Sequence, residues 1–179
     1  RLMCLQAHYR SELEFSWDNL AAAFVRLKRL VMAAERAKAK QLSEPKEQSF
    51  SAYEALAIEH MARFEGAISD DLGTPAALTE LEGSFSLAKL PGTITVAWGE
   101  AMDRVLGLNI FALSRADLRI RPKTAVITEG EIETILTRRK EARAAKDFAT
   151  SDKLRDELIA AGVEVMDGDP LGWDWRLET

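Results

Sequence analysis

The chain has 179 residues, of which 47% are hydrophobic and 30% charged, the balance of an ordinary globular protein. Its single cysteine, Cys4, excludes an internal disulfide and a cysteine-based zinc site, and no apolar run approaches the roughly 20 residues that cross a bilayer. We therefore expect a cytoplasmic protein with no membrane partner, and a mainly helical one because Gly is sparse.

The net charge of −5 is unevenly distributed along the chain. Residues 26–46 contain seven Lys/Arg against two Asp/Glu, residues 104–146 contain ten against five, and the segments after each are acidic. Basic segments of this kind either face a polyanion or carry charge only for solubility. Charge alone favours the second interpretation.

Four helices are predicted over residues 16–107. Ser16 is placed to cap the first, which carries apolar residues at helical spacing. The second helix is expected to end before Gly73. The third should begin with Thr74 as its cap, and the fourth with Thr93 as its cap. Together they predict a four-helix bundle.

Residues 108–127 show no regular spacing of apolar residues and are expected to be a linker with one helical turn. Thr128 followed by Glu131 is a capping box for a helix that runs to about Ala145. Asp147 is placed to cap the next helix, which Gly162 should end.

Two short strands around an Asp-Gly-Asp-Pro turn are predicted to close the chain. The fold class is therefore mainly α. A helical bundle is followed by a small module, residues 128–179, made of a helical hairpin and a terminal two-stranded β-hairpin.

No catalytic constellation stands out in the sequence. The two histidines, His8 and His60, are far apart, and His60 lies on an apolar helical face, where a packed histidine is the commoner case. Asp70 and Asp71 are adjacent carboxylates near a helix end. Carboxylates in such a place are more often helix caps or solvated charges than metal ligands. No catalytic or metal residue is assigned, so the residues alone predict binding rather than catalysis.

The small module carries the residue types that read single-stranded RNA. Arg143 and Phe148 can form planar platforms for bases, and Asp152 and Asp167 can accept hydrogen bonds from base edges. An alternative stays open. Phe148 and Leu154 could instead pack the hairpin, while Asp152, Arg155 and Asp156 form ion pairs on the helix surface.

Three stretches in this order resemble the C-terminal part of the cysteinyl-tRNA synthetase family: "LQAHYRSELEFSWDNLAAA", "DDLGTPAALTEL" and "RRKEARAAKDFATSDKLRDELIAAGVEVMDG". The resemblance covers nearly the whole chain. It implies a DALR-type anticodon-binding bundle, with residues 1–15 as a remnant of the junction after the catalytic domain. His8, Tyr9 and Arg10 would then be junction residues.

The same resemblance implies the partners and cofactors. Cysteine-specific tRNA and the catalytic domain of the same polypeptide would be the partners, and ATP and zinc would serve that catalytic domain. No HIGH or KMSKS motif is present in this chain. We therefore expect a fragment from the tRNA-binding region, which needs no cofactor of its own and is inactive alone. Without the catalytic domain it either binds tRNA or is an inert folded bundle that cannot hold RNA.

The resemblance also assigns roles to residues of the small module. Arg143, Phe148, Asp152 and Asp167 match positions that cluster at the anticodon. Phe148 stands where relatives often have Trp, so it can stack but cannot donate a hydrogen bond. The basic residues expected to contact tRNA phosphates are Arg138, Arg139, Lys140 and Lys146.

A second resemblance supports a different function. "AAKDFATSDKLRDEL" is similar to a helical hairpin of nucleotide-excision-repair proteins, in which such hairpins pair with each other. On that basis the chain would be a protein-interaction module. This resemblance covers only about thirty residues and leaves "HYRS" and "DDLGTP" unexplained.

Overall fold

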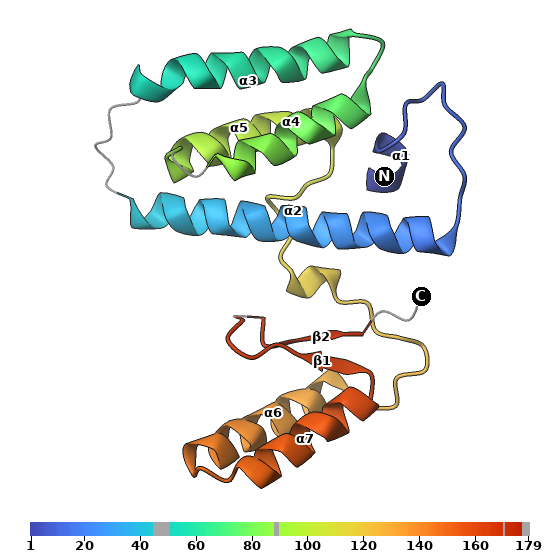
Figure 1. Cartoon of the computed structure of the whole chain (residues 1–179), viewed down its shortest axis with the longest axis vertical. Helices are drawn as coiled ribbons and strands as arrows, with labels where there is room; N and C mark the ends of the chain where they lie inside the picture. The colour runs from blue at the N-terminus through green and yellow to red at the C-terminus, as the bar shows by residue number, and fades with distance from the viewer. Residues whose placement is uncertain (45–50, 88–89, 170, 177–179) are drawn as a thin grey trace. The chain divides into compact units, whose positions relative to one another are not determined.

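The computed structural model describes residues 1–44, 51–87, 90–169 and 171–176 (Figure 1). The predicted start of the second helix and Pro170 of the predicted turn lie outside these ranges. The chain divides into two compact units, Arg1–Asp117 (unit 1) and Leu118–Thr179 (unit 2). In chain order the elements are α1 (Leu2–Leu5), α2 (Trp17–Ser43), α3 (Ser51–Ser69), α4 (Thr74–Ser86), α5 (Gly92–Leu106), the 3-10 turn η1 (Ala116–Leu118), α6 (Glu129–Ala144), α7 (Phe148–Ala160), β1 (Val163–Val165) and β2 (Trp173–Trp175).

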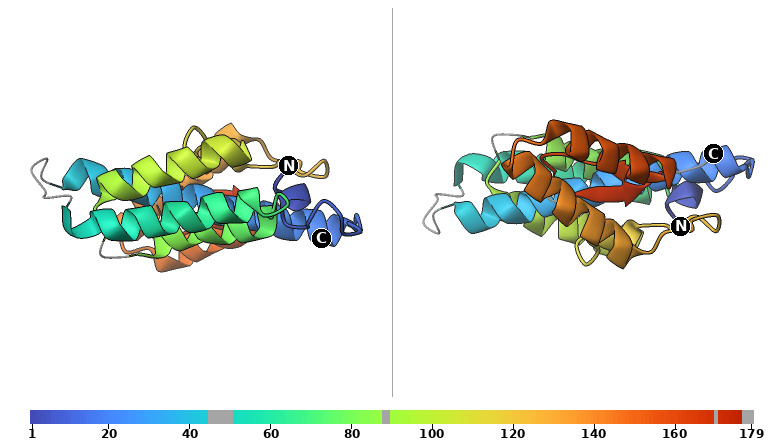
Figure 2. Two further views of the ribbon diagram at one scale, coloured as in Figure 1. Left: turned by 90° about the horizontal axis from the view of Figure 1, so that it is seen from above. Right: turned by 90° about the horizontal axis from the view of Figure 1, so that it is seen from below.

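Unit 1 is the predicted helical bundle. α2 packs along α5, and α3 packs on α4, which in turn contacts α5 (Figures 1 and 2). Each helix buries an apolar stripe between its neighbours, and this burial is the main force that holds such a bundle together. Fully buried core residues include Val31, Leu78, Leu81, Met102 and Ile110.

The cap predicted for α2 is confirmed, and the cap predicted for α4 is wrong. Ser16 Oγ accepts a hydrogen bond from Asn19 N at 3.0 Å, as an N-cap should. Thr74 is already inside α4, whose N-cap is Gly73 and has no side-chain cap bond. The preceding turn, in which Leu72 has φ +54, places the helix start one residue earlier than the threonine suggested.

The cap predicted for α5 is also wrong. Thr93 lies inside the helix, Pro91 is the N-cap, and the first amide is bound from another element: Gly92 N donates to Glu44 Oε2 at 2.6 Å. The carboxylate at the end of α2 thus stands at the positive N-terminus of α5. A Cβ on Gly92 would lie 2.8 Å from the Cα of Gln41, so this close approach requires glycine.

The segment after α5 turns back onto the bundle before it leaves. Leu108, Ile110 and Phe111 are buried, although the sequence predicted a linker from residue 108. Leu108 N donates to the Asp103 carboxylate at 3.1 Å, which fixes this return. The single helical turn predicted in the linker is η1. The boundary between the two units falls inside the predicted linker segment.

The N-terminal segment is bound to the turn between α3 and α4. Tyr9 Oη donates to Asp71 Oδ1 at 2.6 Å, the Arg10 guanidinium lies 3.1 Å from the same oxygen, and His8 Nε2 is 3.0 Å from the Asp71 carbonyl. Asp71 has φ +52, a conformation that needs support in a residue with a side chain. The motifs "HYR" and "DDLG", which are 62 residues apart at Tyr9 and Asp71, are therefore physical partners.

Unit 2 has the predicted helical hairpin and β-hairpin. The capping box joins Thr128 and Glu131, and Asp147 accepts from Thr150 N, so both predicted caps are confirmed. β1 and β2 pair antiparallel, with Val165 opposite Trp173. Their apolar side chains pack on α6 and α7, and the buried residues of this core are Ile132, Ile135, Leu154, Leu158, Val163, Trp173 and Trp175.

Candidate nucleic-acid interface

An arginine of α6 binds a carboxylate of the β-hairpin turn in unit 2. Arg139 Nη1 and Nη2 donate to Asp167 Oδ1 and Oδ2 at 2.6 and 2.7 Å, a two-point contact between a planar fork and a carboxylate. Arg139 is only 7% exposed, and its Nε has no hydrogen-bond partner among the described residues. The buried guanidinium of Arg139 therefore fixes the position of the Asp167 carboxylate from the interior of unit 2.

A second arginine reaches the same carboxylate from the next turn of α6. Arg143 Nη1 lies 3.2 Å from Asp167 Oδ1, and the two side chains are 51% and 43% exposed. The hydrogen bond from Arg139 lowers the pKa of Asp167, and the charges of Arg143 and Arg155 lower it further. Asp167 is thus held as a carboxylate, and it stays accessible to a ligand next to a half-exposed guanidinium.

The residues predicted on α7 lie on one face of that helix. The pKa of Arg139 is raised chiefly by its hydrogen bond to Asp167, and the nearby charge of Asp152 contributes to this shift. Phe148 is 62% exposed and precedes Asp152 by four residues, one helical turn. The structure therefore places Asp167 against both Arg139 and Arg143, sets the charge of Asp152 near Arg139, and leaves Phe148 exposed one helical turn before Asp152.

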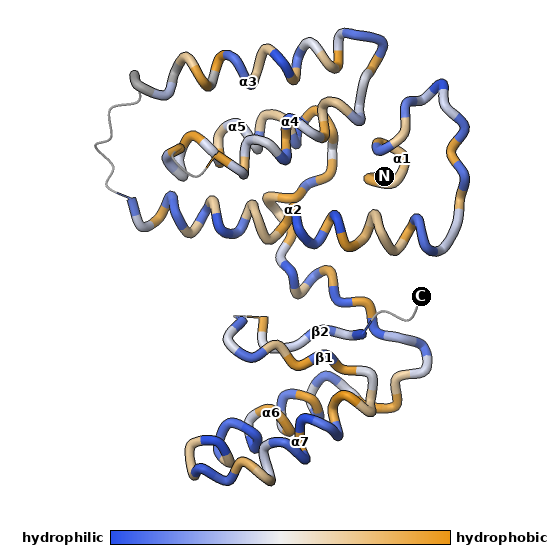
Figure 3. Tube along the Cα trace, viewed as in Figure 1, coloured by the Kyte–Doolittle hydropathy of each residue, from blue (hydrophilic) through white to orange (hydrophobic). Residues whose placement is uncertain are grey.

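The basic residues of α6 and of the turn after it do not share one environment. Arg138, Lys140 and Lys146 are exposed, whereas Arg139, predicted with them as a phosphate contact, is buried and occupied by Asp167. Hydrophilic and apolar residues alternate along the helical hairpin of α6 and α7 (Figure 3). Lys146 stands in that turn with φ +60. The geometry thus favours a positioning role for Arg139.

The alternative was that Phe148 and Leu154 pack the hairpin and that the charged residues of α7 form ion pairs. The structure agrees with it for Leu154 only. Leu154 is buried in the hairpin core, but Phe148 is not packed there. Among the described residues, no ion pair joins Asp152, Arg155 and Asp156 to one another.

Sequence reasoning assigned no site role to two arginines of unit 2, Arg155 and Arg119. Arg155 adds positive charge near Asp167, and its only signal was its position one turn after Asp152. Arg119 Cζ lies 3.9 Å from the centroid of the Trp173 ring and Nη2 donates to the carbonyls of Leu171 and Trp173. No local pattern marked Arg119, because its partners lie more than 50 residues away.

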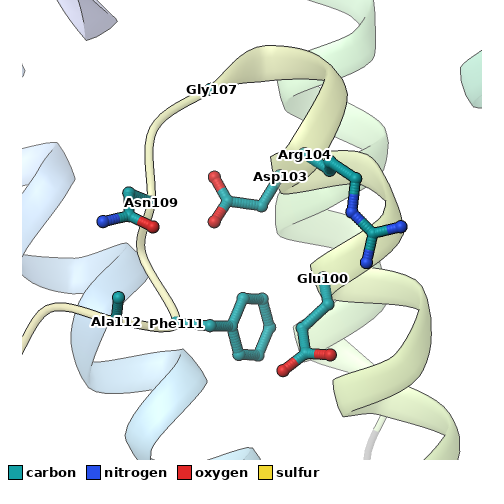
Figure 4. Close-up of a pocket in the computed structure, with 7 residues that line it drawn as sticks. All are labelled: Glu100, Asp103, Arg104, Gly107, Asn109, Phe111 and Ala112. Carbon is teal, nitrogen blue, oxygen red and sulfur yellow. The ribbon is translucent and has the colours of Figure 1, made fainter.

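A pocket of about 660 Å³ in unit 1 offers a different chemistry (Figure 4). Asp103 points toward the segment that carries Asn109, and burial raises the pKa of Asp103 while backbone N–H groups of that segment oppose the shift. Its carboxylate is therefore already occupied by hydrogen bonds from backbone N–H groups. No nucleophilic side chain lines the pocket, whose lining residues are Glu100, Asp103, Arg104, Gly107, Asn109, Phe111 and Ala112.

Two further features were searched for within the described ranges. There, no three or more His, Cys, Asp and Glu side chains are grouped so that they could hold a metal ion. In the same ranges no helix is both long and apolar enough to cross a membrane.

Comparison with known proteins identifies the module that holds the Arg139–Asp167 pair. Residues 128–176 match the family model "Cysteinyl-tRNA ligase anticodon binding domain". Along 99% of its length the chain is 51% identical to a cysteine–tRNA ligase of Novosphingobium aromaticivorans and 44% identical to one of Zymomonas mobilis. A Thermus thermophilus cysteine–tRNA ligase is 35% identical, again over 99% of the chain.

The chain corresponds to the C-terminal region of cysteine–tRNA ligases. It spans 35% to 40% of the length of these three relatives, so it covers only part of such a ligase. The family resemblance inferred from the three sequence stretches is confirmed, and so is the mainly helical fold with a terminal two-stranded sheet. The repair-protein resemblance accounted for about thirty residues, whereas the ligases match nearly the whole chain.

Proposed function

We propose that unit 2 binds the anticodon loop of a cysteine-specific tRNA and recognises its bases. One observation carries the proposal: the matched domain holds a fixed, charged and accessible carboxylate, Asp167, directly beside a half-exposed guanidinium, Arg143. Sequence-specific recognition of RNA needs such groups where unstacked bases can reach them.

The paired groups have complementary hydrogen-bonding roles. A carboxylate only accepts and a guanidinium only donates, so Asp167 and Arg143 together present an acceptor next to a donor. That arrangement fits a base edge on which an amino or imino donor adjoins a ring or carbonyl acceptor. Asp152 adds a second acceptor, and the exposed ring of Phe148 offers a face on which a base can stack.

The remaining cations would position the RNA without reading it. Arg138, Lys140 and Lys146 are exposed near the same end of the hairpin and are suited to phosphate contacts. Arg139 is assigned differently: its guanidinium is buried against Asp167 and would act through that carboxylate rather than on phosphate.

The ligation reaction is proposed for the longer polypeptide, in the cytoplasm, with this chain delivering the tRNA. ATP and zinc would serve the catalytic domain of that polypeptide. The residues present here do not fit a zinc site, because the chain has a single cysteine and its described part groups no suitable ligands. The chain alone is therefore proposed to bind tRNA and to be inactive.

The proposal is tested by direct binding. The 179-residue chain is titrated with a tRNA that carries the cysteine anticodon and with the same tRNA carrying a replaced anticodon, at low and moderate salt. Tighter binding of the cysteine anticodon at both salt concentrations is expected. Equal binding of the two that vanishes with salt would show only a basic surface and would refute anticodon recognition by unit 2.

A further inference from the structure

The turn that carries Asp167 lies outside the paired part of the β-hairpin. β1 and β2 pair over three residues each, and the pair next to the turn is Val165 opposite Trp173. Each arm of the turn then contains a glycine with positive φ, Gly168 at +83 and Gly172 at +75. Glycine is conformationally permissive at such positions. The place of the Asp167 carboxylate therefore depends on contacts other than the strand pairing.

One hydrogen bond ties the two arms of this turn together. Met166 N donates to the Gly172 carbonyl at 2.9 Å, and Met166 directly precedes Asp167 in the chain. A shift of the arm that contains Gly172 would therefore reach Asp167 through one backbone hydrogen bond and one peptide unit.

Arg119, which directly follows η1, binds the arm that contains Gly172. Its Nη2 donates to the carbonyls of Leu171 and Trp173, at 3.0 and 3.1 Å, on the two sides of that glycine. The guanidinium carbon also lies 3.9 Å from the centroid of the Trp173 ring, a distance at which a cation is attracted to an aromatic face. Arg119 thus holds both the backbone of this arm and its largest side chain.

The same tryptophan joins the arm to α6. Trp173 is 2% exposed, and its Nε1 donates to Glu133 Oε1 at 3.3 Å. Arg119 itself is partly buried, and its Nε is buried with no hydrogen-bond partner among the described residues. A cation placed only for solubility would stay in water, so this burial needs another explanation.

We propose that Arg119 is a positioning residue for anticodon recognition, which acts through Asp167. It fixes residues 171–173, and the hydrogen bond of Met166 carries this position to the carboxylate. Arg139 then holds the carboxylate group, whereas Arg119 holds the turn from which that group is presented. A displacement of about 1 Å is enough to spoil the geometry on which selective contacts depend. The inference rests on the function proposed for unit 2.

The test compares two arginines of the same segment. Arg121 resembles Arg119 in charge and in bonding, because its Nη2 donates to two carbonyls, those of Ala125 and Ile127, both at 3.2 Å. These carbonyls precede α6 and are not part of the β-hairpin. Arg119→Gln and Arg121→Gln therefore remove the same charge and the same kind of bond, but only the first releases the turn that carries Asp167.

Each variant of the 179-residue chain is titrated with the tRNA that carries the cysteine anticodon and with the same tRNA carrying a replaced anticodon. Arg119→Gln should lower the ratio of the two affinities by about three- to tenfold, the coupling usual within one hydrogen-bond network. Arg121→Gln should leave the ratio unchanged. A ratio in Arg119→Gln equal to that in Arg121→Gln would overturn the proposal.

Circular dichroism and urea denaturation establish that the variants are folded. Arg119→Lys is used if Arg119→Gln does not fold, with Arg121→Lys as its control. Lysine keeps the charge but lacks the Nη2 atom that reaches both carbonyls, so the ratio should fall in Arg119→Lys too.

A second arm of the experiment asks whether Arg119 acts through Asp167. In an Asp167→Asn background the carboxylate is already lost, so adding Arg119→Gln should change the ratio by less than about twofold. An effect as large as in the unmodified chain would overturn the proposal. The slope of log K against log salt should be equal in Arg119→Gln and Arg121→Gln. A slope lower by about one in Arg119→Gln alone would indicate a direct phosphate contact and would overturn it as well.

A measurement without RNA separates this inference from a failure of anticodon recognition. The hydrogen bond from Arg139 lowers the pKa of Asp167, so the titration of this carboxyl group reports how closely it meets Arg139. Its carboxyl ¹³C signal should titrate at a higher pH in Arg119→Gln than in Arg121→Gln. If this shift is seen while the unmodified chain binds both tRNAs equally or binds neither, the positioning of Asp167 stands and recognition by unit 2 fails. Equal titration in the two variants would overturn the inference.

Discussion

Arg139 and Asp167 are 28 residues apart in the sequence and meet through two hydrogen bonds of 2.6 and 2.7 Å. The arginine is buried and the aspartate is not, so the pair has an inner and an outer side. The inner side stabilises the β-hairpin turn against α6, and the outer side leaves the carboxylate open for the RNA contact that we propose. Stability and recognition are therefore expected to depend on the same contact.

Asp167→Asn should lower both the stability of the fold and the preference for the cysteine anticodon. It leaves the Arg139 guanidinium buried opposite an amide, which can accept through one oxygen only, so we expect a loss of about 1–3 kcal/mol in the free energy of unfolding. Urea denaturation measures this loss, and the preference for the cysteine anticodon should fall in the same variant. Asp156→Asn, on the exposed side of α7, is the control. A stability equal to wild type would contradict the structural role.

The Asp167 pair should also give the chain a pH dependence. The folded pKa of Asp167 lies below its ordinary value near 3.8, so the folded state binds fewer protons than the unfolded state in that range. This contribution to stability is present above the ordinary pKa and is lost as pH falls through the folded pKa. Urea midpoints at pH 7, 4 and 3 should therefore converge between wild type and Asp167→Asn. A constant difference would count against the lowered pKa.

Asp152→Ala should separate recognition from stability. Asp152 is exposed on α7, and its interaction with Arg139 is one of charge at a distance. We expect a change in unfolding free energy within about 0.5 kcal/mol, as is usual for surface positions, together with a relaxed anticodon preference. Binding of the two tRNAs and urea denaturation are measured on the same sample. An unchanged preference would remove Asp152 from the proposed site.

Lys140→Ala combined with Lys146→Ala should change affinity without changing preference. Both side chains are exposed, and phosphate contacts are independent of sequence. Binding should weaken for both tRNAs, and the slope of log K against log salt should fall by about two. If the slope stays at its wild-type value, these lysines do not contact phosphate and only keep the helix surface hydrated.

Gly92→Ala should destabilise unit 1, and Gly66→Ala should not. A Cβ at Gly92 would come within 2.8 Å of the backbone of Gln41, so α5 or α2 must move, at a cost of about 1–3 kcal/mol. Gly66 lies inside α3 with nothing within 4 Å of the added methyl, and Ala there should stabilise by about 0.5–1 kcal/mol. Thermal melts of the two variants should therefore shift in opposite directions.

Local signals in the sequence were sufficient for several helix starts. Ser16, Thr128 and Asp147 cap their helices as predicted, because an N-cap bond reaches only two or three residues along the chain. The same logic failed at Thr74 and Thr93. α4 begins directly after the turn at Leu72, one residue before the position that Thr74 suggested. α5 begins at an amide that Glu44 binds, and Glu44 is far from Thr93 in the sequence.

The sequence by itself determined the helical class, the hairpins and the set of residues from which an RNA site could be built. It could not distinguish Arg138, Arg139 and Lys140, three neighbouring cations of one helix. Only the tertiary structure decided that Arg139 is buried, because the turn after β1 brings Asp167 back to α6 and the β-hairpin covers one face of that helix. Periodicity and caps are local properties of a chain, whereas burial and ion pairing depend on what distant segments bring into contact.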